Sequence, residues 1–137
     1  MKCVKCESNA VISMMRHNAG FCKEHFTEYF HRQVETAVRD HSMLKKSDRI
    51  MVCVSGGKDS LVLWHVLNLM GYDTVGMYVS LGIGEYSIRS KAKVNAFAEK
   101  HGLKAVIVDL DEEGCPIPLL AAKTKRNDCS VCGQVKR

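Results

Sequence analysis

Residues 50–70, IMVCVSGGKDSLVLWHVLNLM, form the most informative segment of this sequence. The first part, residues 50–54, is a short continuous apolar run, which is typical of a parallel strand buried on both faces. The last part, residues 61–70, is long and apolar enough for a buried helix, which Gly71 can end. The hexapeptide between them, residues 55–60, is therefore expected at a turn from strand to helix, where α/β proteins bind ligands.

The same succession of strand, loop and helix is expected in residues 74–108. Residues 74–79 (TVGMYV) are expected to form a second strand, residues 81–87 (LGIGEYS) a glycine-containing loop, and residues 105–108 (AVIV) a third buried strand. Between them, residues 88–101 are expected to form a helix that Gly102 ends, with Ala92, Val94, Phe97 and Ala98 facing inward. This pattern predicts an α/β fold with a partial doubly wound parallel sheet, whose strand-end loops share one edge.

Upstream, residues 23–46 are expected to form one long amphipathic helix. Its apolar positions recur at spacings of three and four, and they are Phe26, Tyr29, Phe30, Val34, Ala37 and Val38. Its outer face carries Glu28, Arg32, Glu35 and Arg39. Residues 45–49 (KKSDR) have the composition of a short linker. We therefore expect two domains, residues 1–46 and residues 47–137, of which the second contains the sheet.

The composition excludes several classes of protein. Of the 137 residues, 46% are hydrophobic, which is enough for a compact core and argues against disorder. No apolar run reaches the ~20 residues that a membrane span needs, and the first residues, MKCVKCESN, lack the apolar segment of a signal peptide. We therefore expect a cytoplasmic protein without membrane association, in which paired cysteines are metal or cluster ligands rather than disulfides.

The net charge of +5 is unevenly distributed. Residues 123–137 contain five Lys and Arg residues against one Asp. A basic segment of this kind favours a polyanionic partner such as RNA. The same composition also fits a solvated, partly disordered tail, so the charge alone leaves both interpretations open.

Four potential metal ligands occur in two closely spaced pairs, Cys3-x2-Cys6 and Cys22-x2-His25. Three thiolates and one imidazole suit tetrahedral zinc, and the closed set of four ligands predicts a structural rather than a catalytic ion. His17 could compete as a ligand but has no paired spacing. The alternative is a set of redox-active or merely buried thiols.

Residues 55–60, SGGKDS, have the composition of a phosphate-binding loop. Two glycines let the backbone turn tightly and direct several N–H groups toward one point, and the following helix N-terminus adds partial positive charge. Lys58 adds a full charge, while Ser55 and Ser60 offer hydroxyls. Asp59 suits a helix cap or a magnesium ligand better than a direct phosphate contact. The spacing differs from that of the Walker loop, and an ordinary glycine turn is the alternative.

A second cysteine pair, Cys129-x2-Cys132, lies in the basic C-terminal segment. Two thiolates do not complete a site, because zinc normally takes four ligands and a cubane cluster at least three cysteines. Either the remaining ligands come from another segment, or the pair is a dithiol–disulfide couple. Of the remaining cysteines, Cys53 is expected to be a small core residue and Cys115 a free thiol in a loop.

These motifs, together with LGIGEYS (81–87) and CSVCGQVKR (129–137), carry a family resemblance. Over its whole length the chain resembles the TtcA/TtuA tRNA 2-thiolation enzymes of the PP-loop ATP pyrophosphatase superfamily, and the N-terminal knuckle favours the TtuA and wobble-uridine-thiolation branch. The resemblance implies that ATP bound at the loop adenylates the 2-oxygen of a tRNA uridine. It further implies that sulfur then attacks the activated carbon, delivered through a [4Fe-4S] cluster that three cysteines hold.

The resemblance also implies site residues and partners. The catalytic residues would be Lys58, Asp59, Cys129 and Cys132, of which the two cysteines are two of the three cluster ligands. The site for ATP and magnesium would comprise Val54, Ser55, Gly56, Gly57, Lys58, Asp59, Ser60, Val79, Gly82 and Gly84, and the zinc ligands would be Cys3, Cys6, Cys22 and His25. The implied partners are tRNA, a ubiquitin-like sulfur carrier with a C-terminal thiocarboxylate or another sulfur donor, and a second copy of the full-length enzyme in a homodimer.

Members of this family are roughly twice as long as this chain. We therefore expect the chain to be the N-terminal half of such an enzyme, either truncated or one part of a split enzyme, and to be inactive alone. One alternative is a non-catalytic ATP- or RNA-binding module that needs a partner chain. Another is a different PP-loop adenylating ligase or a sulfate-type reductase, which fits the loop but has no use for the N-terminal knuckle.

Overall fold

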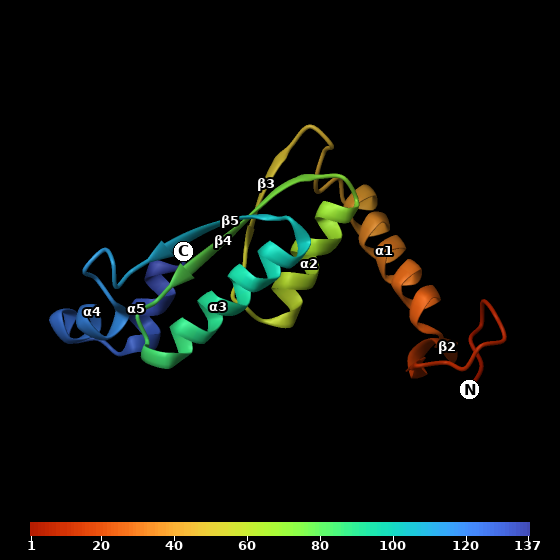
Figure 1. Cartoon of the computed structure of the whole chain (residues 1–137), viewed down its shortest axis with the longest axis horizontal. Coiled ribbons are helices and arrows are strands. Elements are labelled where there is room, and N and C mark those ends of the chain that lie inside the picture. Colours follow the sequence, from red (N-terminus) through yellow and green to blue (C-terminus); the bar gives the residue numbers. More distant parts are fainter. The chain divides into compact units, whose positions relative to one another are not determined.

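The computed structural model describes all residues, Met1–Arg137. The chain separates into two units, Met1–Lys45 and Lys46–Arg137, and each is described by itself (Figure 1). None of the helices combines the length and the apolar composition needed to cross a bilayer.

The N-terminal unit consists of a small hairpin and one long helix. Strands β1 (Ile12–Met14) and β2 (Ala19–Phe21) pair antiparallel around the short 3-10 helix η1 (Met15–His17), and helix α1 (Lys23–Asp40) follows directly. The Phe21 ring at the end of β2 stacks on Tyr29 of α1, with ring centroids 5.0 Å apart. This contact joins the hairpin to the first half of the helix.

Helix α1 is shorter than the expected helix over residues 23–46. Ser42 adopts a left-handed backbone with φ of 48°. The Ser42 N–H donates to the Arg39 carbonyl and the Met43 N–H donates to the Val38 carbonyl, which is the hydrogen-bond pattern of a Schellman cap. The helix therefore ends at a local turn that needs no glycine. On its expected apolar face Val38 is buried, but Phe30 and Ala37 are exposed, contrary to prediction.

The C-terminal unit contains the predicted parallel sheet, and the α/β fold class is confirmed. Strands β3 (Arg49–Cys53), β4 (Asp73–Ser80) and β5 (Lys104–Asp109) pair in the order β3-β4-β5, with Val52 opposite Gly76 and Gly76 opposite Ala105. Helices α2 (Lys58–Leu69) and α3 (Gly84–His101) form the two crossovers. All three strands thus end at one edge, where both crossover loops lie.

Both crossover helices cover the same face of the sheet (Figure 1). A Cβ on Gly76 of β4 would collide with the Trp64 ring of α2. Two residues later, on the same face of β4, the Tyr78 hydroxyl donates to the Ser87 carbonyl of α3. The opposite face has no such cover, so Met51 is 60% and Val106 50% exposed. The expectation that these strands are buried on both faces is therefore wrong.

Helix α3 differs from prediction in its start and its inward face. It begins at Gly84, so half of the expected loop over residues 81–87 is helical, and the Ser87 hydroxyl accepts the Ile83 N–H at 2.9 Å near this end. Its buried positions are Ser87, Ser90, Val94 and Ala98. Ala92 is exposed, because two residues of helix turn it about 200° away from Val94. Gly102, with φ of 62°, ends the helix as predicted.

The C-terminal segment is helical rather than a disordered tail. Helices α4 (Ile117–Thr124) and α5 (Asp128–Val135) pack together, and the Asn127 side chain caps α5 by accepting the Ser130 N–H at 2.8 Å. A small apolar core beneath them consists of Leu81, Leu110, Ile117, Ala121 and Val131. The five cations of residues 123–137 all stay exposed on this ordered segment.

Candidate functional site

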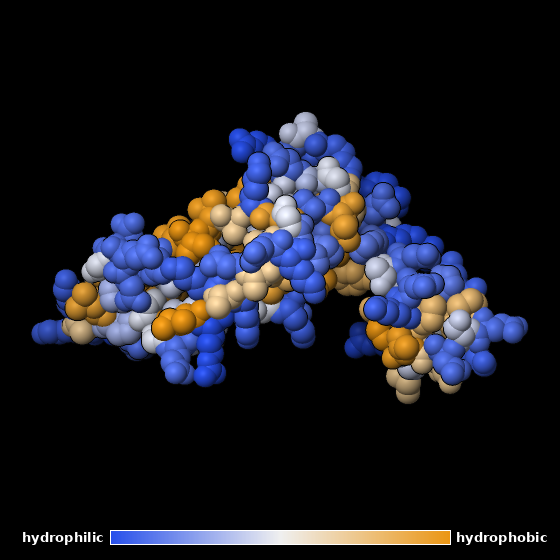
Figure 2. All heavy atoms as spheres, viewed as in Figure 1, coloured by the Kyte–Doolittle hydropathy of each residue, from blue (hydrophilic) through white to orange (hydrophobic).

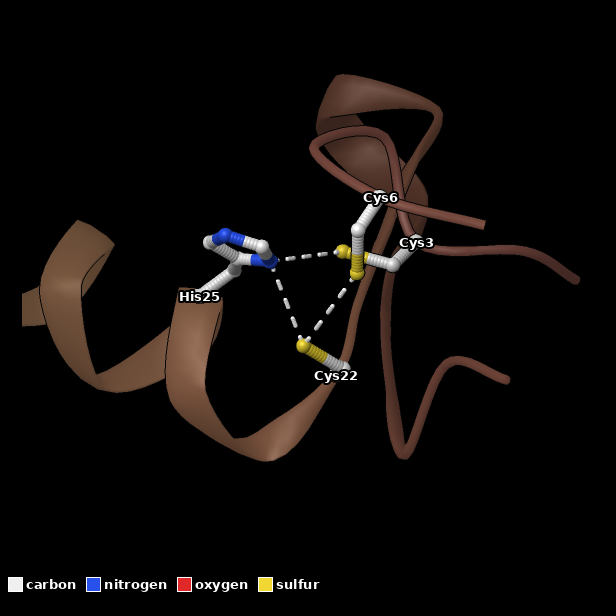
Figure 3. A group of neighbouring side chains, drawn as sticks. All are labelled: Cys3, Cys6, Cys22 and His25. Carbon is white, nitrogen blue, oxygen red and sulfur yellow. Dashed lines mark hydrogen bonds between the residues drawn. The ribbon is translucent and has the colours of Figure 1, made fainter. Parts of the chain in front are cut away.

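The four predicted metal ligands of the N-terminal unit lie together (Figure 3). Their ligand atoms are all within 4.8 Å of one another. His25 Nδ1 is 3.5 Å from Cys3 Sγ and 3.3 Å from Cys22 Sγ, and the Cys6 and Cys22 sulfurs are 3.8 Å apart. Tetrahedral zinc with ordinary bond lengths separates such atoms by about 3.4–3.8 Å, so the donor set fits this ion.

Local backbone structure places each ligand. The Cys3 N–H donates to the Ser8 carbonyl at 2.9 Å, which closes the loop that carries the first pair. The Lys5 N–H points at the Cys3 sulfur, 3.5 Å away. Cys22 is the N-cap residue of α1 and His25 lies in its first turn, so the second pair is presented by the helix start. A metal ion here would join the N-terminal loop to α1.

The environment of Cys3 favours its thiolate form. Burial acts to raise the pKa of the Cys3 thiol. The pKa is nevertheless lowered from 9.0 to about 6 by backbone N–H bonds from Cys22, Lys5 and Cys6 and by the hydrogen bond with His25. The hydrogen bond with Cys3 in turn raises the pKa of His25. Because metals bind the thiolate, a ligand of this kind is already in its binding form near neutral pH.

The glycine loop lies between β3 and α2, as predicted. Gly56 has φ of 76°, a conformation that side chains rarely adopt, and Gly57 is the N-cap residue of α2. The Ser60 hydroxyl accepts the Ser55 N–H at 3.1 Å and donates to the Gly57 carbonyl at 3.1 Å. These bonds hold the loop against the N-terminus of α2, and a helix N-terminus of this kind can bind an anion such as phosphate.

Lys58 and Asp59 occupy the first turn of α2 and point into solvent. Their side chains are 87% and 90% exposed, and Lys58 Nζ lies 2.9 Å from Asp59 Oδ1. An exposed pair of this kind contributes little to stability. Both groups are therefore free to turn toward an anion and its counter-ion at the helix N-terminus.

A cavity of about 460 Å³ opens on the uncovered face of the sheet, beside the glycine loop. Three predicted nucleotide-site residues, Val54, Ser55 and Val79, line it. The other predicted residues, which are residues 56–60, Gly82 and Gly84, are not part of this lining, and Gly82 instead lies against Pro116 and Asp111. The cavity therefore supports only part of the predicted nucleotide site.

Further residues line the cavity without having been predicted as site residues: Met51, Cys53, Met77, Leu81, Tyr86, Val135, Lys136 and Arg137. Cys53 is exposed here, so its prediction as a core residue is wrong. It alternates with buried Val52 and Val54, because successive side chains of a strand point to opposite faces of the sheet. The run IMVCV is apolar at every position, so the sequence contains no signal for an exposed face. Apolar atoms also gather over β5, next to this region, in Figure 2.

The second CxxC pair lies on helix α5. Cys129 is exposed and Cys132 is half-buried against the small C-terminal core, to which half-buried Cys115 also packs. Neither residue of the pair belongs to a group of three or more potential ligands. The end of the same helix, at Val135, together with the two residues that follow, lines the cavity. Ser55 of the glycine loop and the end of the cysteine-bearing helix thus line one cavity, although neither Cys129 nor Cys132 is part of its lining.

Comparison with known proteins gives a consistent set of similarities. Residues 2–27 match the family described as the N-terminal LIM domain of 2-thiouridine synthetase TtuA. A tRNA-5-methyluridine(54) 2-sulfurtransferase of Thermus thermophilus is 45% identical over all of this chain and 43% of its own length. The cytoplasmic tRNA 2-thiolation protein 1 of Chlamydomonas reinhardtii is 27% identical over 98% of this chain and 40% of its own length.

A solved structure is also similar, the U34-tRNA thiolase NcsA from Methanococcus maripaludis with its [4Fe-4S] cluster. The TM-score is 0.82 at 27% identity, and the match covers all of this chain and 48% of that protein. The chain thus spans less than half the length of each of these proteins.

Proposed function

We propose that this chain, which is similar over its whole length to the N-terminal part of TtuA-type tRNA 2-thiouridine synthetases, supplies the ATP-binding and metal-binding part of a tRNA uridine 2-thiolation enzyme. The observation that supports this function best is the cavity shared by Ser55 of the glycine loop and by Lys136 and Arg137 at the end of the cysteine-bearing helix. Thiolation needs both an activating nucleotide and a sulfur-carrying site near one reacting uridine.

At the glycine loop, the backbone N–H groups and the α2 N-terminus would hold the phosphates, with hydroxyl contacts from Ser55 and Ser60. Lys58 would neutralise charge as pyrophosphate departs, and Asp59 would hold magnesium. Val54 and Val79 would contact the adenine at the end of the sheet. ATP, when bound, supplies the adenylyl group that makes the uridine 2-oxygen a leaving group.

On α5, Cys129 and Cys132 lie one helical turn apart and would provide two thiolate ligands of a [4Fe-4S] cluster. The cluster, when bound, carries the sulfur to be transferred. The third ligand would come from a polypeptide beyond this chain. The exposed cations Lys136 and Arg137 beside the cavity suit the tRNA backbone.

The N-terminal centre has a structural role in this proposal. Zinc held by Cys3, Cys6, Cys22 and His25 would have no open position for water or substrate. The hairpin and α1 bury few apolar side chains, so the ion would provide much of the stability of this unit. The complete enzyme would act in the cytoplasm as a homodimer and accept sulfur from a ubiquitin-like carrier protein with a C-terminal thiocarboxylate.

The test combines the chain with a polypeptide that covers the remaining length of the Thermus thermophilus relative. Under anaerobic conditions, with tRNA, ATP, magnesium and a sulfide donor, we expect 2-thiouridine from the combination and none from either part alone. Mass spectrometry of digested tRNA measures the product. Failure of the chain to bind ATP would contradict the proposal.

A second candidate function is a non-catalytic ATP- or RNA-binding module, and the incomplete cysteine pair on α5 favours it. Such a module would bind ATP and tRNA but give no 2-thiouridine in the combined assay. The same experiment therefore separates the two functions.

A further inference from the structure

A half-buried ion pair on α3 has no part in the sites described above. Lys91 Nζ lies 2.6 Å from Asp109 Oδ2, at the end of β5, and 3.4 Å from Glu112 Oε1. The Lys91 and Asp109 side chains are 32% and 10% exposed, whereas every ion pair outside this cluster joins side chains that are more than half exposed. The hydrogen bond between them raises the pKa of Lys91 and lowers that of Asp109, so both stay charged at neutral pH.

The neighbouring residue, Ser90, is buried against the glycine loop. A Cβ placed on Gly56 would lie 3.1 Å from the Ser90 carbonyl oxygen and 3.3 Å from its Cα and Cβ. The backbone of α3 and the left-handed glycine of the loop therefore touch with almost no space between them. A displacement of this turn of α3 would remove the surface that supports Gly56.

The first turns of α3 are tied to the sheet at successive points. The Tyr78 hydroxyl of β4 donates to the Ser87 carbonyl at 3.3 Å. One turn further along, the Lys91–Asp109 pair ties α3 to the end of β5, and the Asp111 N–H fixes the carboxylate by donating to its other oxygen at 3.1 Å. Ser90 lies between these two attachments.

We propose that Lys91 and Asp109 are positioning residues for the glycine loop: their ion pair holds α3 where Ser90 supports Gly56 in its phosphate-binding conformation. Neither residue lines the cavity, so the pair acts through α3 rather than by touching the ligand. The inference rests on the proposed nucleotide binding at this loop.

The test measures the affinity of the chain for ATP with magnesium by titration calorimetry. We expect Lys91→Met to weaken binding roughly tenfold, which corresponds to the loss of a partly buried charged hydrogen bond. Lys91→Arg should restore most of the affinity because it keeps the charge. The matched control is Arg89→Met, which breaks the exposed Arg89–Glu85 pair on the same helix and should leave binding unchanged.

A second measurement needs no nucleotide. In two-dimensional NMR spectra of the chain alone, Lys91→Met should shift the amide signals of Gly56 and Gly57, and Arg89→Met should not. Asp109→Asn provides an independent variant if Lys91→Met fails to fold. Unchanged ATP affinity together with unchanged loop amides would overturn the inference. Loop amides that shift in a chain that binds no ATP would support the positioning role and contradict the proposed function instead.

Discussion

The two CxxC pairs of this chain have the same spacing but different surroundings. Cys3 and Cys6 lie in a loop, and a second pair from the start of α1 brings the set to four ligands within 4.8 Å. Cys129 and Cys132 lie on a helix, and no further ligand of this chain joins them. The spacing therefore produces a pair of ligands, whereas the surrounding fold determines whether the pair becomes a complete site.

The largest expected effect follows from removing one ligand of the complete site. Cys22→Ser should abolish zinc binding and unfold the N-terminal unit, because structural zinc contributes about 10–16 kcal/mol of apparent binding free energy in small domains. Metal analysis and NMR spectra of Met1–Lys45 signals measure the loss, while the sheet signals stay unchanged. Cys115→Ser is the control. One zinc per chain in Cys22→Ser would contradict this role.

Cys129 and Cys132 should fail to hold a stable [4Fe-4S] cluster in this chain alone. After anaerobic reconstitution, we expect iron and sulfide well below the four of each that a cubane needs, because two thiolates leave it short of its third ligand. Iron and sulfide analysis on a size-exclusion fraction measures this. A stoichiometric cluster on the monomer would show that another residue of this chain completes the site.

Lys58→Ala should impair the glycine loop and leave the complete N-terminal metal site unchanged. We expect ATP affinity to fall roughly a hundredfold and adenylation to be lost, because a charge-assisted contact to phosphate disappears, while zinc content stays the same. Calorimetry and metal analysis on the same sample measure the ATP affinity and the zinc content, and the combined assay with the remaining polypeptide and tRNA measures the product that depends on adenylation. Lys93→Ala, an exposed lysine on α3, is the control. Unchanged adenylation in Lys58→Ala would refute the assignment of this loop.

The smallest effect concerns pH and only the C-terminal unit. The folded-state pKa of Asp109 is lowered by Lys91, so the carboxylate adds stability above its unfolded value near 3.8 and loses that contribution as the pH falls through the folded value. Asp109→Asn should therefore lower the urea midpoint more at pH 6 than at pH 2. If Asp109→Asn lowered the urea midpoint equally at pH 6 and at pH 2, the ionised Asp109 carboxylate would not be the source of the stability.

Much of the metal centre and of the loop could be predicted, and the reasons are local. The two-residue spacers of Cys3, Cys6, Cys22 and His25 limit how far apart their ligand atoms can lie. The hexapeptide SGGKDS lies between two apolar runs, and this order predicts a strand, a loop and a helix. In the structure these segments are β3, the glycine loop and α2, and Gly56 has a positive φ in the loop. Each ligand pair and the loop depend on residues that are close in sequence, whereas Cys3 and His25, 22 residues apart, are brought together by the fold.

The remaining features could not be predicted because they depend on contacts between distant segments. The burial of Met51 and Cys53 depends on whether any helix covers their side of the sheet, and both crossovers lie on the other side. Residues 123–137 form ordered helical structure because Val131 packs in one core with Leu81 and Ile117. These two residues are 50 and 14 positions away along the chain.

From the sequence alone, we could predict two closely spaced pairs of potential metal ligands, a glycine loop between strand and helix, and a three-stranded parallel sheet. Spacing and apolar periodicity are properties of short segments. Tertiary packing determined the uncovered sheet face, the cavity that joins the loop to the cysteine-bearing helix, and the contact of Ser90 with Gly56. Those features arise where β3, α3 and α5 meet, and no local pattern encodes which side of a strand will be covered.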